Sequence, residues 1–116
     1  MGREKLFVEL KAEELLAEVA RLQGKIRRKC KAARDMENSA DSVYLNTGEG
    51  VAHFKPKMKI MKYEIARGEA KEVQRALNAL VIKRKLKKED IEKAHDLADQ
   101  VIALLTNLIK SIQDRL

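Results

Sequence analysis

Apolar residues recur three or four positions apart along most of this chain, and that spacing marks one face of an α-helix. Two stretches show it most regularly. Residues 5–23 carry a seam of five apolar side chains, and the stretch from residue 88 onward carries a seam of seven. We predict that each forms a long amphipathic helix whose seam is buried: Val8, Ala12, Leu15, Val19 and Leu22 in the first, and Ile91, Ala94, Ala98, Val101, Leu105, Leu108 and Ile112 in the second.

Two further helices are predicted between these, with less regular seams. Gly24 is expected to end the first helix. The second is expected to cover residues 25–47 and to end at Gly48 and Gly50, because glycine readily closes a helix end. Pro56 suits the first turn of the next helix, residues 57–83. Their inward positions are expected to be Ile26, Cys30, Ala33, Ala40 and Val43, then Met58, Met61, Ile65, Ala66, Ala70, Val73, Leu77 and Leu80.

The connections between the four predicted helices are short, and short connections place successive helices antiparallel. Composition agrees with this, since 37% of the residues are charged and only 3% are aromatic, a profile typical of long helices. We therefore predict an all-α, up-down-up-down antiparallel four-helix bundle that occupies residues 1–116 as a single domain.

Cellular context is indicated only weakly by the sequence. The single cysteine, Cys30, cannot form a disulfide within the chain, which favours a reducing compartment. No apolar run approaches the roughly 20 residues of a membrane span, and no signal peptide opens the chain. We expect a cytoplasmic protein with no membrane partner.

Positive charge is concentrated in two segments that an antiparallel bundle brings to the same end, residues 21–35 and 81–90. Together they hold twelve cations and only three acidic residues, whereas the whole chain has a net charge of +7. An uneven distribution of this kind indicates an anionic partner more strongly than an even one would. The predicted nucleic-acid-binding residues are Lys25, Arg27, Arg28, Lys29, Lys31, Arg34, Lys83, Arg84, Lys85, Lys87 and Lys88.

Aromatic side chains that could stack on bases are absent from these basic segments. The chain has no Trp, and its four aromatic residues (Phe7, Tyr44, Phe54 and Tyr63) lie elsewhere. We therefore expect contact with backbone phosphates and a strong dependence on salt. No catalytic residue, metal ligand or cofactor is predicted, because the two histidines, His53 and His95, are expected at the surface without a partner base or a ligand cluster.

A group of polar residues and glycines in the middle of the chain needs a separate explanation. Ser42 and Asn46 are four residues apart and so share a helix face, where we expect a polar clip that fixes helix register, with Glu49, Glu72 or backbone groups of the adjacent third helix as partners. Gly68 costs about 1 kcal/mol relative to Ala inside a helix, so we expect it at a close helix crossing.

These same residues carry a resemblance to a known family. The spacing Ser42…Asn46…Glu49-Gly50, followed by Ile65-Ala66-Arg67-Gly68 and Glu72, resembles the four helix bundle protein family, also called 23S rRNA intervening-sequence proteins. It is also similar to the related accessory variability proteins of diversity-generating retroelements. The resemblance implies a homopentameric ring of four-helix protomers, RNA rather than DNA as the nucleic acid, and possible attachment to a reverse transcriptase.

Three functional hypotheses follow. The first is a non-enzymatic, oligomeric protein that binds RNA or DNA phosphates through its basic end. The second is a protein-only oligomeric scaffold that docks an acidic partner, and the third, a small enzyme, lacks any catalytic constellation. Oligomer formation is expected because apolar residues lie beside the four seams: Phe7, Leu16, Ile60, Tyr63, Ile82, Leu104 and Ile109.

Overall fold

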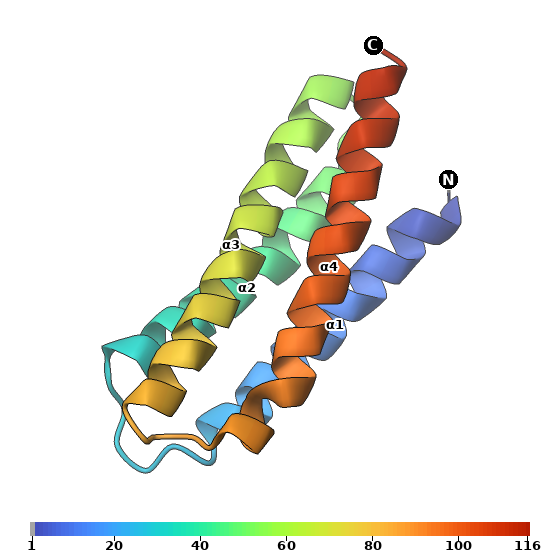
Figure 1. Ribbon diagram of the computed structural model, residues 1–116. Helices are drawn as coiled ribbons and strands as arrows, with labels where there is room; N and C mark the ends of the chain where they lie inside the picture. The colour runs from blue at the N-terminus through green and yellow to red at the C-terminus, as the bar shows by residue number, and fades with distance from the viewer. Residues whose placement is uncertain (1) are drawn as a thin grey trace.

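The computed structural model describes residues 2–116, apart from the side chains of residues 2 and 4, and it confirms the all-α four-helix prediction. Helix α1 spans Gly2–Gln23, α2 spans Lys31–Ala52, α3 spans Pro56–Ile82 and α4 spans Lys88–Asp114. Successive helices run in opposite directions, so both chain ends lie at one end of the bundle with the α2–α3 turn (Figure 1). The α1–α2 and α3–α4 turns lie together at the other end.

Each helix packs against its neighbours in sequence, and α1 also packs against α4, which closes the bundle. The result is an elongated molecule with principal extents of 47 × 21 × 18 Å. Its long axis matches the roughly 40 Å length expected for helices of 27 residues.

The two regular seams occupy the core as predicted. All five seam residues of α1 and all seven of α4 are buried. The start of α4 is stabilised locally, because the backbone N–H of Lys87 donates a hydrogen bond of 2.8 Å to the Asp90 carboxylate. Acidic side chains in a first turn also interact favourably with the helix dipole.

The predicted bounds of α2 are wrong at both ends. The helix starts at Lys31 because residues 24–30 form a turn, in which Ile26 is buried as an apolar anchor. It continues through Gly48 and Gly50 to Ala52, and neither glycine has a positive φ. Both glycines therefore lie inside the helix and do not end it.

Gly50 has a packing role. A Cβ atom placed there would lie 2.5 and 2.6 Å from two ring carbons of Tyr63, which is far closer than such atoms can approach. The Tyr63 ring on α3 thus occupies the space that a side chain on α2 would fill. The glycine that allows close helix packing is therefore Gly50 on α2, and not Gly68 on α3 as predicted.

Helix α3 begins at Pro56, one residue before the predicted start, and five of its predicted inward residues are buried: Ala66, Ala70, Val73, Leu77 and Leu80. The first part of its predicted seam is wrong. Met61 and Ile65 are exposed instead of buried, and Tyr63, predicted to face a partner, is fully buried. Ile109 on α4 is likewise buried in the core. Within residues 2–116 no helix is long and apolar enough to cross a membrane.

Candidate nucleic-acid interface

The turns that follow α1 and α3 form the end of the bundle opposite the chain termini (Figure 1). We call this end, with the adjoining first turns of α2 and α4, the basic end. It contains all eleven cations that the sequence singled out for nucleic-acid binding: Lys25, Arg27, Arg28, Lys29, Lys31, Arg34, Lys83, Arg84, Lys85, Lys87 and Lys88.

Residues 83–87 form the turn after α3, and one of them adopts the left-handed backbone conformation. Arg84 has a φ of 59°, and in the described part of the chain it is the one residue other than glycine with a positive φ. The backbone N–H groups of Lys85 and Leu86 then donate to the carbonyl of Leu80, at 2.9 and 3.3 Å. Buried Leu86 anchors the turn, so Arg84 is held at its exposed apex.

Residues 24–30 are held by both local and long-range contacts. The N–H groups of Lys25 and Ile26 donate to the carbonyls of Leu22 and Gln23 at 3.0 and 3.2 Å. The Gln23 side chain in turn donates to the Ala33 carbonyl at 2.7 Å, which ties the end of α1 to the first turns of α2.

An ion pair connects the first turn to the start of α4. Lys25 Nζ lies 2.9 Å from Asp90 Oδ1, across 65 residues of sequence. The hydrogen bond from Lys25, followed by that from the Lys87 backbone, lowers the pKa of the Asp90 carboxyl group. This pairing uses one of the few carboxylates at the basic end.

Most of the basic residues face solvent. Ten of the eleven side chains are exposed, and Lys85 is half-buried. Two carry local contacts, since Lys31 pairs with Asp35 at 2.8 Å and Lys29 donates to Gln23 at 2.9 Å. The exposed guanidinium and ammonium groups present donors that suit phosphate oxygens.

Cys30 lies between these cations, half-buried at the start of α2. The backbone N–H of Ala33 lowers the pKa of its thiol most, and the positive charges of Lys83 and Lys85 lower it further. The α3–α4 turn, which carries these two lysines, lies at the same end of the bundle as the start of α2 (Figure 1).

The polar residues of the family motif, Ser42, Asn46, Glu49 and Glu72, do not form one cluster. Asn46 donates to the carbonyl and the hydroxyl of Ser42 at 2.9 and 3.0 Å, so these bonds lie within α2 and do not connect it to α3 as the predicted clip would. Glu49 instead pairs with Lys62 of α3 at 2.8 Å, and Lys62 lowers its pKa. Glu72 is exposed.

Gly68 does not mark a helix crossing. A Cβ atom added there would meet nothing within 4 Å, and the residue is exposed on α3. The expectation failed because a glycine inside a helix indicates close approach only where a neighbouring group occupies the space of the missing side chain, as Tyr63 does at Gly50.

His53 and His95 are half-buried. His53 follows the last residue of α2 and His95 lies within α4. Across residues 2–116 no group of three or more His, Cys, Asp or Glu side chains is arranged to hold a metal ion.

Comparison with known proteins gives a consistent result for the fold. A family model described as "23S rRNA-intervening sequence protein" matches residues 4–107. A crystal structure of a protein of unknown function from the S23 ribosomal protein family of Bacteroides thetaiotaomicron superposes with a TM-score of 0.84 and 22% identity, covering 89% of this chain and 98% of that one. The comparison with curated proteins gives no match.

Proposed function

Because the chain belongs to the 23S rRNA-intervening sequence protein family, we propose that it is a non-enzymatic, oligomeric protein that binds the phosphate backbone of structured RNA through its basic end. The observation that carries this proposal is the gathering of eleven cations from two distant segments at one end of the bundle. Phosphate contacts of this kind provide affinity with little sequence preference.

The charge of the basic end is poorly neutralised by the protein itself. Among the twelve cations of residues 21–35 and 81–90, ion pairs within the described chain involve Arg21, Lys25 and Lys31. The remaining lysines and arginines repel one another in the free protein. A polyanion would relieve that repulsion, and releasing its counterions would add to the affinity.

The backbone of Arg84 gives a second line of support. A left-handed conformation costs about 1–2 kcal/mol for a residue other than glycine, so glycine would suit this position better for stability. Retaining an arginine at the exposed apex of the turn is consistent with selection for a cation there.

An apolar groove supports the oligomeric part of the proposal. Exposed Leu6, Leu10, Tyr44 and Leu45 line it between α1 and α2, together with the acidic side chains of Glu9, Glu13 and Glu49. Contiguous exposed apolar surface of this kind usually marks an interaction site. We propose that a second copy of the chain covers it, within the homopentameric ring that the family resemblance implies.

A ring would multiply the effect of the basic end, because several weak phosphate contacts on linked subunits bind far more tightly than one. The resemblance to accessory variability proteins also suggests a reverse transcriptase as a further protein partner. The alternative function is a scaffold whose basic end docks an acidic protein.

The proposal can be tested with two charge-matched variants. The first replaces Arg27, Arg28, Lys83, Lys87 and Lys88, all exposed at the basic end, with glutamine. The control replaces five exposed cations elsewhere with glutamine: Arg3, Lys57, Lys71, Arg75 and Lys110. Fluorescence anisotropy with a structured RNA should show weaker binding for the first variant alone.

Equal loss of affinity in both variants would mean that only net charge matters. Unchanged affinity in the first variant would remove the basic end as the RNA site. Binding to polyglutamate but not to RNA by the wild-type protein would favour the scaffold alternative.

A further inference from the structure

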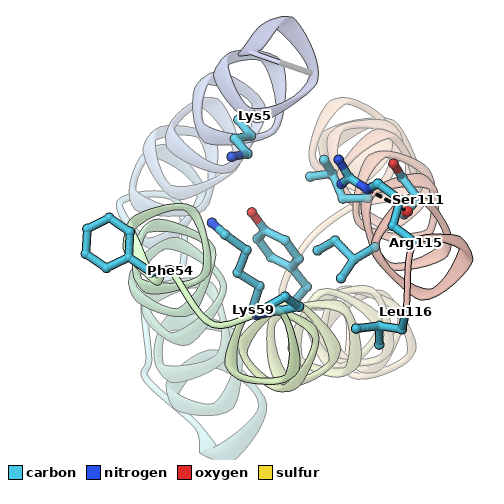
Figure 2. A pocket seen from close by; sticks show the side chains of 10 residues that line it. Lys5, Phe54, Lys59, Ser111, Arg115 and Leu116 are labelled. Atoms are coloured by element: carbon cyan, nitrogen blue, oxygen red, sulfur yellow. Dashed lines mark hydrogen bonds between the residues drawn. The ribbon is translucent and has the colours of Figure 1, made fainter.

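A pocket of about 350 Å³ opens at the opposite end of the bundle, where the chain termini lie. It is bounded by α1, α3 and α4, and the residues on which the following argument rests are Lys5, Lys59, Tyr63, Leu108 and Ile112. In Figure 2, Lys5 and Lys59 project toward the middle of the bundle end, whereas Phe54 points away from it.

Tyr63 presents an unpaired hydroxyl group at this pocket. Its side chain is 0% exposed, yet the hydroxyl has no hydrogen-bond partner within residues 2–116. Burial, followed by the charge of Glu9, raises the pKa of Tyr63 to about 12, so the hydroxyl stays protonated and able to donate. Buried polar groups are nearly always hydrogen-bonded, so an unpaired one needs an explanation.

Two lysine side chains, Lys5 and Lys59, line the same pocket. Lys59 Nζ donates to the carbonyls of Gly50 and Val51, both at 2.9 Å, at the C-terminal end of α2. Burial lowers the pKa of Lys59 most, and the positive charge of Lys5 lowers it further. The ion pairs found in the described chain involve neither lysine.

The pocket therefore combines a buried hydroxyl donor, the ammonium groups of Lys5 and Lys59 and the guanidinium group of Arg115 with an apolar wall. The wall is formed by Leu108 and Ile112 of α4, which are buried seam residues. An oxyanion would accept hydrogen bonds from the hydroxyl and the ammonium groups, and an apolar body would contact the wall. The volume is at the lower end of the roughly 300–1,000 Å³ typical of small-molecule sites.

We propose that this pocket binds a small organic anion, a carboxylate or phosphate monoester attached to an apolar body. The site lies at the end of the bundle away from the basic end and stands independently of RNA binding (Figures 1 and 2).

The first experiment titrates the full chain with phenyl phosphate, benzoate and inorganic phosphate, using calorimetry and the amide spectrum of isotope-labelled protein. We expect saturable one-to-one binding per chain of phenyl phosphate or benzoate, with shifts at Gly50 and Ile112. Inorganic phosphate should bind at least about tenfold more weakly, because it lacks the apolar part. Absence of saturable binding by all three probes at millimolar concentration would overturn the proposal, as would equal binding of inorganic phosphate.

The second experiment assigns the binding to the pocket. Tyr63→Phe keeps the buried ring and removes only the unpaired hydroxyl, so the protein should still fold, and Lys5→Gln removes one cation. Each should weaken phenyl phosphate binding by about tenfold or more, since each deletes a donor to the anion. Lys57→Gln, an exposed change in the first turn of α3, is the control and should bind as the wild type does.

The five-residue basic-end variant should also bind phenyl phosphate normally. If that variant loses the probe while Tyr63→Phe and Lys5→Gln retain it, the ligand binds at the basic end and the pocket proposal is wrong. Wild-type affinity in both pocket variants would contradict it equally.

Discussion

A hydrogen atom in place of a side chain at Gly50 leaves room for the ring of Tyr63, and this pair determines how closely α2 and α3 approach. The periodicity of apolar residues could not predict the pair, because a glycine inside a helix resembles a helix end in the sequence. Its meaning depends on a ring thirteen residues further along, on another helix. Gly68, which has open space around it, shows the opposite case.

Alanine at Gly50 should therefore destabilise the protein. Its methyl group would overlap the buried Tyr63 ring, and overpacking of this kind costs about 1–3 kcal/mol. Gly68→Ala is the matched control, and it should stabilise the protein by about 0.5–1 kcal/mol, since it only improves helix propensity. Urea unfolding measures both changes, and equal shifts of the same sign would contradict the packing explanation.

Glu18 should make stability depend on pH. Its carboxylate is buried and accepts two hydrogen bonds from Arg21, at 2.9 and 2.6 Å, and the first cause of its lowered pKa is this bonding. A carboxyl group whose folded pKa is lowered stabilises the folded state above its unfolded pKa, near 4.5, and loses that contribution as the pH falls through the folded value.

Glu18→Gln should accordingly cost about 1 kcal/mol at pH 7, a figure discounted because Arg21 is exposed. It should also flatten the decline in stability between neutral and acid pH. Thermal unfolding across that range, with exposed Glu92→Gln on α4 as the control, checks this. The explanation fails if the wild type and Glu18→Gln lose stability in parallel.

At the scale of the elements, α1 and α4 could be predicted because their apolar seams repeat without interruption over many turns. The start of α2 could not, because Ile26 continues the apolar spacing although it is an anchor of the turn. On α3, Met61 and Ile65 fit the helical period but are exposed, whereas Tyr63, which lies beside the predicted seam, is buried against Gly50.

The α3–α4 turn offers a test in which stability and function should change in opposite directions. Arg84→Gly relieves the left-handed strain at φ 59° and should stabilise the fold by about 1 kcal/mol. It should also weaken RNA binding, because it removes a cation from the exposed apex. Chemical denaturation measures the change in stability, and fluorescence anisotropy measures the change in RNA affinity. A loss of stability in Arg84→Gly would show that the turn does not favour glycine.

For the whole molecule, the sequence indicated which cations share an end, because antiparallel helices bring alternate turns together. The pocket at the other end could not be predicted, since Lys5, Lys59 and Tyr63 come from separate helices or helical turns and their spacing carries no recognisable signal. A cluster of charged residues along the sequence can be recognised without a structure, whereas a pocket formed by single residues from separate helices cannot.

The groove between α1 and α2 makes the assembly testable. Light scattering of the wild type should give a mass about five times the 13.2 kDa of one chain. Leu45→Glu places a charge in the exposed apolar groove and should dissociate the assembly while each chain stays helical. Met61→Glu also places a charge at an exposed apolar site, outside the groove on α3, and should leave the mass unchanged. A monomeric wild type would contradict the assembly, and an intact Leu45→Glu oligomer would exclude this groove as its interface.

The most direct test of the central claim is the salt dependence of RNA binding. The logarithm of the association constant should fall steeply and linearly with the logarithm of salt concentration for the wild type. For the variant with Arg27, Arg28, Lys83, Lys87 and Lys88 replaced by glutamine, the slope should shrink by about one unit for each lost phosphate contact. The same affinity and the same slope in both proteins would show that the basic end does not contact RNA.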